Sequence, residues 1–281
     1  MNLQRLTLTP SSTERHELRD DLVLEEPLEI RLEYFDGQET LKHSLAVTMR
    51  TPGHDEELAL GFLLTEGIIG DADCVAEIRG CGPQTEDYAT QNIVRVKLCP
   101  GTKPVLGKTE RNFYATSSCG ICGKASLDAV MAAGIAKIAR DAVKIPSHTV
   151  AEIPQLLRAW QPTFASTGAN HGAALLTSTA EVICSREDVG RHNAVDKVIG
   201  ASALAGENWR KLCANTIMAV SGRAGFELVQ KSLVAGIPMM VAIGAPSSLA
   251  VDLARRFDMT LVGFVRDNRY NIYSGEWRIH D

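Results

Sequence analysis

The chain has 281 residues, of which 45% are hydrophobic and 22% charged, and its 34 acidic and 29 basic side chains give a formal net charge of -5. This composition is typical of a folded protein with a substantial core, and the acidic balance argues against a general nucleic-acid-binding protein. No apolar run reaches the roughly 18 residues of a membrane span, and residues 1–20 lack the apolar core of a secretory signal, so we expect a cytoplasmic protein without membrane or nucleic-acid partners.

The first half of the chain is predicted to be rich in strands, with one clear helix. Strands are expected over residues 28–34, 41–49 and 92–98, and a turn at Asp36-Gly37 joins the first two. A helix is expected over residues 55–65, because Glu56 and Glu57 suit the positive end of the helix dipole and the leucines that follow can share one buried face.

From about residue 171 the pattern changes to strands that alternate with helices. Strands are expected over residues 173–176, 182–185, 216–221, 238–243 and 260–265, and helices over 192–204, 226–234 and 248–257. Such alternation predicts an α/β layer with a mixed, largely parallel sheet, in which ligands gather where strand carboxyl ends meet helix amino ends.

Two domains are therefore predicted. The first, residues 1–140, is a strand-rich domain with one helix and a cysteine-containing loop at its end. The second, residues 141–281, is the α/β domain, and its ligand-binding edge makes it the candidate cofactor-binding domain. A short connecting helix is expected over residues 147–162.

The chain contains seven cysteines, and this odd number favours free thiols in a reducing compartment over a disulfide framework. Cys184 and Cys213 lie in apolar runs and are expected to pack as small hydrophobic side chains. Cys119 and Cys122 instead form a C-x-x-C pair that directly precedes a predicted helix over residues 125–138. The amino terminus of that helix, together with Lys124, would stabilise a thiolate.

The C-x-x-C spacing by itself is compatible with three kinds of chemistry. It can be half of a structural zinc site, although a closed site needs four ligands and the sequence contains no second such pair. It can be a dithiol redox pair, or it can contain a reactive cysteine that carries a chemical group. The motif alone does not distinguish them.

The run Glu187-Asp188-Val189-Gly190-Arg191-His192-Asn193-Ala194-Val195-Asp196-Lys197 is unusually dense in polar chemistry. One interpretation is a capped helix with a solvated face, in which Asp188 or Asn193 is the cap. The other is a polar pocket in which Arg191 binds an anion and His192 donates a proton or a hydrogen bond.

Four more segments stand next to predicted strands. The first is the stretch from Thr167 to Gly172, which contains His171. This histidine is either a core residue bonded to the backbone, or part of a site where the flanking glycines allow another molecule to approach closely. Ser221-Gly222-Arg223 and Gly244-Ala245-Pro246-Ser247-Ser248 place small residues at helix starts, which suits phosphate binding, although neither is a P-loop. Residues 264–270 offer two arginines and two aromatic side chains that could hold phosphates and stack a base, or form a solvated turn.

Taken in order, these segments resemble the FdhD family of sulfur-carrier proteins needed for formate dehydrogenase activity. The resemblance begins near residues 60–69, continues through Cys119-Gly120-Ile121-Cys122-Gly123 and the run from Glu187 to Lys197, and ends with residues 227–232 and 260–264. It implies a fold similar to that of cytidine deaminases, with a three-layer carboxyl-terminal part. Deamination itself is not expected, because the H-x-E and P-C-x-x-C zinc signature is absent.

The resemblance implies a sulfurtransferase with a cysteine persulfide intermediate and no permanent cofactor or metal. Sulfur would come from a cysteine desulfurase, pass to the molybdenum or tungsten bis-guanine-dinucleotide cofactor, and serve formate dehydrogenase as the client. The persulfide would form on Cys119, with Cys122 as its partner, in a protein that is a homodimer. The cofactor-binding residues would be Phe264, Val265, Arg266, Asp267, Asn268, Arg269 and Tyr270, together with Arg223 and His192.

Overall fold

The computed structural model describes residues 2–8, 15–84, 91–106, 135–206 and 208–281. Within these ranges the chain is a mixed α/β protein built mainly on two sheets. The larger has six strands in the order β13-β12-β11-β10-β8-β9, and the smaller has four in the order β4-β3-β6-β5. No helix in the described ranges is long and apolar enough to cross a membrane.

The six-stranded sheet contains β8 (His171–Leu176), β9 (Val182–Asp188), β10 (Ile217–Val220), β11 (Met239–Ala242), β12 (Thr260–Arg266) and β13 (Arg269–Ser274). Strands β10, β11 and β12 are parallel, β8 pairs antiparallel with both β10 and β9, and β13 pairs antiparallel with β12. The carboxyl ends of the three parallel strands therefore share one edge of the sheet with the start of β8 and the end of β9.

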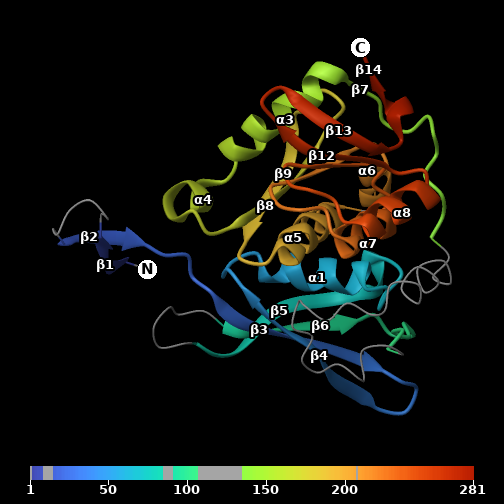
Figure 1. Ribbon diagram of the computed structural model, residues 1–281. Coiled ribbons are helices and arrows are strands. Elements are labelled where there is room, and N and C mark those ends of the chain that lie inside the picture. The colour runs from blue at the N-terminus through green and yellow to red at the C-terminus, as the bar shows by residue number, and fades with distance from the viewer. Residues whose placement is uncertain (1, 9–14, 85–90, 107–134, 207) are drawn as a thin grey trace.

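Alternate residues of this sheet face two separate cores. In β8, Ala173 and Leu175 belong to one core while Ala174 and Leu176 belong to the other. One face is covered by α3 (Ser147–Ala159), and the other by α5 (Arg191–Leu204), α7 (Phe226–Val234) and α8 (Ser248–Arg256). This alternation gives the layered arrangement of Figure 1, as expected for a sheet buried on both faces.

The four-stranded sheet contains β3 (Glu26–Phe35), β4 (Thr40–Arg50), β5 (Val75–Gln84) and β6 (Gln91–Leu98). The β3–β4 hairpin turns at the predicted position, where the Asp36 carboxylate accepts the backbone N–H groups of Gln38 and Glu39 at 2.7 and 2.9 Å. Gly37 has a φ of +112°, a conformation that favours glycine.

Helix α1 (Asp55–Thr65) lies between this sheet and the helices of the α/β layer (Figure 1). It is buried on several sides, and it crosses α5 closely through Gly61 and Gly200. A Cβ atom at Gly61 would overlap the carbonyl of Asp196, and one at Gly200 would overlap the carbonyl of Glu57. One hydrophobic core consequently runs from β3 to α8, while the predicted boundary at residue 140 stays a prediction.

The remaining elements are short and mostly peripheral. They are β1 (Asn2–Leu8), β2 (Arg15–Asp21), η1 (Ala72–Cys74), β7 (Ile145–Pro146), α4 (Pro162–Thr167), α6 (Trp209–Cys213), η3 (Glu276–Arg278) and β14 (Ile279–His280). Strands β1 and β2 form a separate two-stranded sheet at the side of the molecule (Figure 1).

The mixed α/β class is confirmed, as are the predicted strands and helices other than the helix over residues 125–138, and the bounds of α1 and α7 match the prediction. Within the two main sheets, strands β5 and β13 were not predicted. The helix expected over residues 125–138 is wrong at its end: residues 135–139 form no helix, and the Ile138 N–H donates to the Phe257 carbonyl at 2.9 Å. Residues 125–134 lie outside the described ranges.

Candidate functional site

The turns that follow β10 and β11 meet the last residues of β12 at one edge of the six-stranded sheet. The Gly244 N–H donates to the Gly222 carbonyl at 3.0 Å, and the Phe264 N–H donates to the Gly244 carbonyl at 3.1 Å. A Cβ atom at Gly244 would lie 2.8 Å from the Gly222 oxygen, so this contact requires glycine. The turns after β10 and β11 and the end of β12 therefore lie together at the strand ends. The N–H groups of Ala224, Gly244 and Ser247, however, hydrogen bond between turns rather than being available to phosphate.

Four basic side chains, which we call the cationic cluster, lie beside these turns: His171, Arg191, His192 and Arg223. Burial lowers the pKa of His171, and the nearby Arg191, His192 and Arg223 side chains lower it further against the opposing effect of the Asp188 carboxylate, so its imidazole is neutral at neutral pH. Nε2 of His192 lies 2.7 Å from Oε2 of Glu227, and this hydrogen bond lowers the pKa of the Glu227 carboxyl. Within the described ranges, neither arginine has a carboxylate at ion-pair distance.

The local electrostatics favour an anion at this cluster. Helices α5 and α7 begin after Gly190 and Gly225, which have no side chain to accept the free N–H groups of the first turn. Arg191 and His192 are the first two residues of α5, where the helix dipole disfavours positive charge. A bound anion would interact favourably with the helix termini and the cationic side chains together.

Other polar residues of the run from Glu187 to Lys197 face the interior and bind the segment that follows β4. The Asp188 carboxylate is fully buried and lies 2.7 Å from Nζ of Lys197. It also accepts the Thr51 N–H at 3.1 Å and the Asn193 side-chain amide at 3.0 Å. Lys197 donates in turn to the Thr51 carbonyl at 2.8 Å.

Asp196 is buried in a second network. Its Oδ1 accepts the Thr65 hydroxyl at 2.7 Å, and its Oδ2 lies 3.0 Å from Nζ of Lys231. Because Asp196 and Lys197 are 2% and 1% exposed, the interpretation of this run as a helix with a solvated face is wrong for these two residues. The run therefore contains two groups of residues. Arg191 and His192 lie at the cationic cluster, whereas Asp188 and Asp196 bind the end of β4 and the end of α1.

The predicted cofactor-binding stretch forms the β12–β13 hairpin. Arg266 and Arg269 pair across a two-residue turn in which Asp267 and Asn268 have φ values of +51° and +57°, as in a type I′ turn. All four residues are exposed. Both arginines therefore extend from a hairpin tip rather than from the strand-end turns.

The other members of that stretch differ from one another in environment. Phe264 is 37% exposed, has a φ of +55° and donates its N–H to the Gly244 carbonyl, so it lies beside the turn that follows β11. The Val265 side chain is fully buried in the core beneath α3 and can offer a ligand only its backbone. The Tyr270 hydroxyl lies 2.8 Å from the Ser147 hydroxyl.

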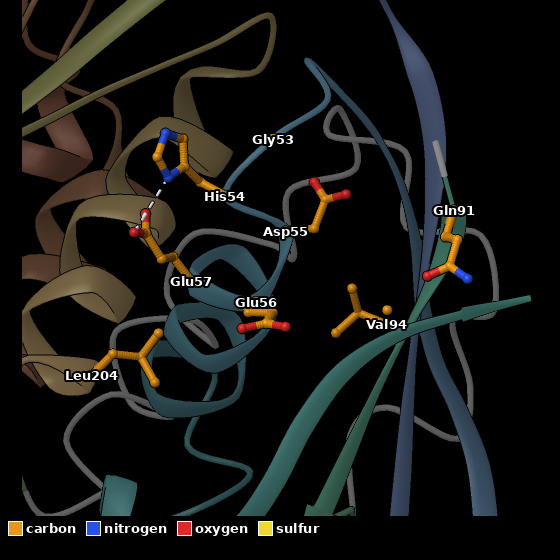
Figure 2. Close-up of a pocket in the computed structure, with 9 residues that line it drawn as sticks. Gly53, His54, Asp55, Glu56, Glu57, Gln91, Val94 and Leu204 are labelled. Carbon is orange, nitrogen blue, oxygen red and sulfur yellow. Dashed lines mark ion pairs between the residues drawn. The ribbon is translucent and has the colours of Figure 1, made fainter. Parts of the chain in front are cut away.

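A separate pocket of about 540 Å³ opens at the amino end of α1. Figure 2 shows Asp55, Glu56 and Glu57 around it, with Nδ1 of His54 lying 3.3 Å from Oε1 of Glu57. Arg186 also pairs with Glu57, its Nη2 lying 2.7 Å from Oε1. Three carboxylates make this pocket unsuited to an anionic ligand, and the cationic cluster at the strand ends is the better candidate site.

Cys119, Cys122 and Lys124 lie outside the described ranges. Cys213 is fully buried, as predicted, and burial raises the pKa of its thiol to about 12. Burial also raises the pKa of the half-buried Cys184 thiol, so neither is a ready nucleophile. Among the described residues, no three His, Cys, Asp or Glu side chains gather as a metal site.

Two residues near the cluster were not predicted as site residues. Glu227 is the partner of His192, but nothing in its local sequence distinguishes it from an ordinary first-turn acid. Asn170 was noted only as part of the glycine-flanked segment before β8. Its side chain is 3% exposed, and this burial is visible only in the fold.

The sequence and the structure of this chain are similar to those of known proteins. A family model described as FdhD/NarQ family matches residues 23–280. A protein of Streptomyces avermitilis named sulfur carrier protein FdhD is 49% identical to this chain over 262 residues, and the match covers 92% of this chain and 89% of the relative. A protein of Mycobacterium tuberculosis with the same name is 45% identical over 264 residues, and the match covers 92% of each chain. A crystal structure of a Desulfotalea psychrophila protein described as a formate dehydrogenase accessory protein superposes with a TM-score of 0.74 at 25% identity, covering 100% of this chain and 99% of that one.

Proposed function

The chain belongs to the FdhD/NarQ family, and from this premise we propose that it is a sulfur carrier, a sulfurtransferase that passes persulfide sulfur from a cysteine desulfurase to the molybdenum or tungsten bis-guanine-dinucleotide cofactor. The shared name of its relatives supports the sulfur-carrying part. The description of the Desulfotalea psychrophila protein supports formate dehydrogenase as the client. We also propose that the carrier is cytoplasmic and that it is a homodimer. Sedimentation analysis of the full chain would test the dimer.

The sulfur step is proposed at Cys119. Its thiolate attacks the terminal sulfur of the donor persulfide, the donor S–S bond breaks, and the donor cysteine leaves as a thiolate. Cys119 then carries the terminal sulfur as its own persulfide. Cys122 either attacks the inner sulfur of that persulfide, forming a Cys119–Cys122 disulfide and releasing hydrosulfide toward the metal, or stabilises the loaded state.

The observation that carries the cofactor-binding part is the cationic cluster at the strand ends. Arg191 and Arg223 have no carboxylate at ion-pair distance in the described ranges, and the uncapped ends of α5 and α7 lie beside them. A diphosphate is the kind of ligand that such a set binds, because arginine and helix amino termini both hydrogen bond to phosphate oxygens. Phe264 lies at the same edge, where it could contact a base.

Mass spectrometry of the intact chain after incubation with a cysteine desulfurase and cysteine tests the sulfur-carrying function. The expected result is a gain of one sulfur atom, about 32 Da, which a reductant reverses. A dithiol oxidoreductase would instead reduce disulfide substrates and gain no sulfur. A zinc-binding module would contain about one tightly bound zinc per chain on metal analysis. Either of those results without the mass gain would overturn the proposal.

Charge reversal at the cluster tests the cofactor-binding part, with guanosine diphosphate as a probe for half of the dinucleotide cofactor. We expect Arg191→Glu and Arg223→Glu each to weaken binding at least about tenfold by isothermal titration calorimetry, since a hydrogen bond to a charged group contributes about 1.5–3 kcal/mol. Lys42→Glu, which makes the same change at an exposed position on β4, should bind like the unaltered chain. Equal binding by all three variants would exclude this cluster as the phosphate site.

A further inference from the structure

Asn170 has a buried hydrogen-bond donor with no acceptor among the residues that the structure describes. The residue directly precedes β8 and is 3% exposed. Its Oδ1 accepts the Thr51 hydroxyl at 3.1 Å, whereas its Nδ2 has no hydrogen-bond partner in the described part of the chain. Folded proteins rarely leave a buried amide N–H unpaired, because its lost hydration is not replaced. Such a group indicates that an acceptor comes from outside the described part of the chain.

The orientation of this amide follows from its neighbours. The Thr51 oxygen accepts the Val189 N–H at 3.1 Å, and the Thr51 hydroxyl has a single hydrogen, which it donates to Asn170. If the amide were reversed, the Thr51 hydrogen and the Asn170 carbonyl oxygen would both lack partners. The network therefore fixes the side chain with its N–H groups directed away from Thr51.

The position of Asn170 connects this donor to the cationic cluster. His171, the next residue, pairs with Asp188 across β8 and β9, so Asn170 lies alongside Val189 in the loop that leads into α5. That loop continues through Gly190 to Arg191. A buried, fixed N–H thus stands at the entrance to a helix amino terminus that also has a neutral imidazole and two arginines nearby. The buried N–H, the helix terminus and the two arginines each favour an anionic oxygen.

We propose that Asn170 is a ligand-binding residue whose Nδ2–H donates to a phosphate oxygen of the nucleotide bound at the cluster. This inference rests on the proposed cofactor-binding function and adds a residue to it. The acceptor is anionic rather than a neutral carbonyl, because Arg191 and Arg223 act on the neighbouring His171, whereas the nearby Asp188 carboxylate is already paired with Lys197. Thr51 acts as a positioning residue, since it holds the amide in place without itself reaching the ligand.

The decisive variant is Asn170→Asp, which keeps the oxygen that accepts from Thr51 and replaces the N–H donor with a negatively charged oxygen. Titration calorimetry with guanosine diphosphate should show an affinity loss of at least about tenfold, while titration with guanosine should show no difference between the variant and the unaltered chain. Asn215→Asp is the matched control, because Asn215 is exposed at the opposite edge of the sheet and its amide already donates to the Lys211 carbonyl. It should bind guanosine diphosphate normally.

A second variant keeps the test decisive if Asn170→Asp does not fold. Thr51→Val leaves Asn170 intact but removes the group that fixes its amide, and it should weaken guanosine diphosphate binding by about threefold to tenfold. Unchanged binding in the folded Asn170→Asp variant, or in Thr51→Val when Asn170→Asp does not fold, would overturn the inference and leave the buried N–H to an internal water.

The same measurements separate this inference from the function on which it rests. If the unaltered chain does not bind guanosine diphosphate, the cofactor-binding proposal fails. If it binds, and Asn170→Asp binds equally well, only the role of Asn170 fails.

Discussion

Replacing Cys119 with alanine is expected to abolish sulfur loading, so that incubation with a cysteine desulfurase and cysteine adds no mass to the variant. The reason is chemical: only a thiolate can attack the donor persulfide, and alanine has no nucleophile. A formate dehydrogenase matured with this variant should consequently lack activity. Intact-mass measurement checks the first effect, and a coupled maturation assay checks the second.

Two other cysteine variants make this result specific. Cys99→Ala removes a half-buried thiol whose Sγ lies 3.5 Å from the Asp73 carbonyl, and it should load sulfur like the unaltered chain. Cys122→Ala distinguishes the two roles proposed for the second cysteine. Loading without delivery would indicate attack on the persulfide, and loss of loading would indicate stabilisation of the loaded state. Full loading of Cys119→Ala would contradict the carrier function.

The second large effect is expected at the buried Asp188–Lys197 pair. Changing Asp188 to asparagine should lower the free energy of unfolding by about 3–5 kcal/mol, which is typical when one partner of a buried ion pair is removed. The new amide would leave the Lys197 ammonium without a countercharge and would set an N–H group against donors such as the Thr51 N–H. Urea denaturation monitored by circular dichroism measures the change.

Two further variants test whether this loss comes from the uncompensated charge. Asp188→Asn combined with Lys197→Met should recover part of the lost stability, because the second change removes the unpaired ammonium. Asp267→Asn is the exposed control, since its nearest cation, Arg269, lies 3.8 Å away on the hairpin surface and both side chains are more than 70% exposed. It should leave the unfolding midpoint unchanged. A drop in stability similar to that of Asp188→Asn would rule out burial as the cause.

Several elements could be predicted from short segments of sequence because their causes are local. The bounds of α1 follow from a turn before Asp55 and a glycine after Thr65, and the β3–β4 hairpin follows from the Asp36-Gly37 turn, whose carboxylate bonds to the next two N–H groups. Strand β5 was missed because two glycines and a proline interrupt its pattern, and β13 because its polar residues resemble a loop. Residues 135–139 read as the end of a helix, but they extend along the core to reach Phe257.

What the sequence by itself determined is the inventory of chemistry: a C-x-x-C pair before a predicted helix, a dense polar run before another, and glycine-rich turns at strand ends. Only the tertiary structure decided which members of the run bind and which hold the fold together. Arg191 and His192 lie at the cationic cluster, while Asp196 and Lys197 find partners on segments more than 130 residues earlier in the chain. The physical reason is that a charged side chain is stable in the interior only beside a compensating group, and that group comes from another element of the fold.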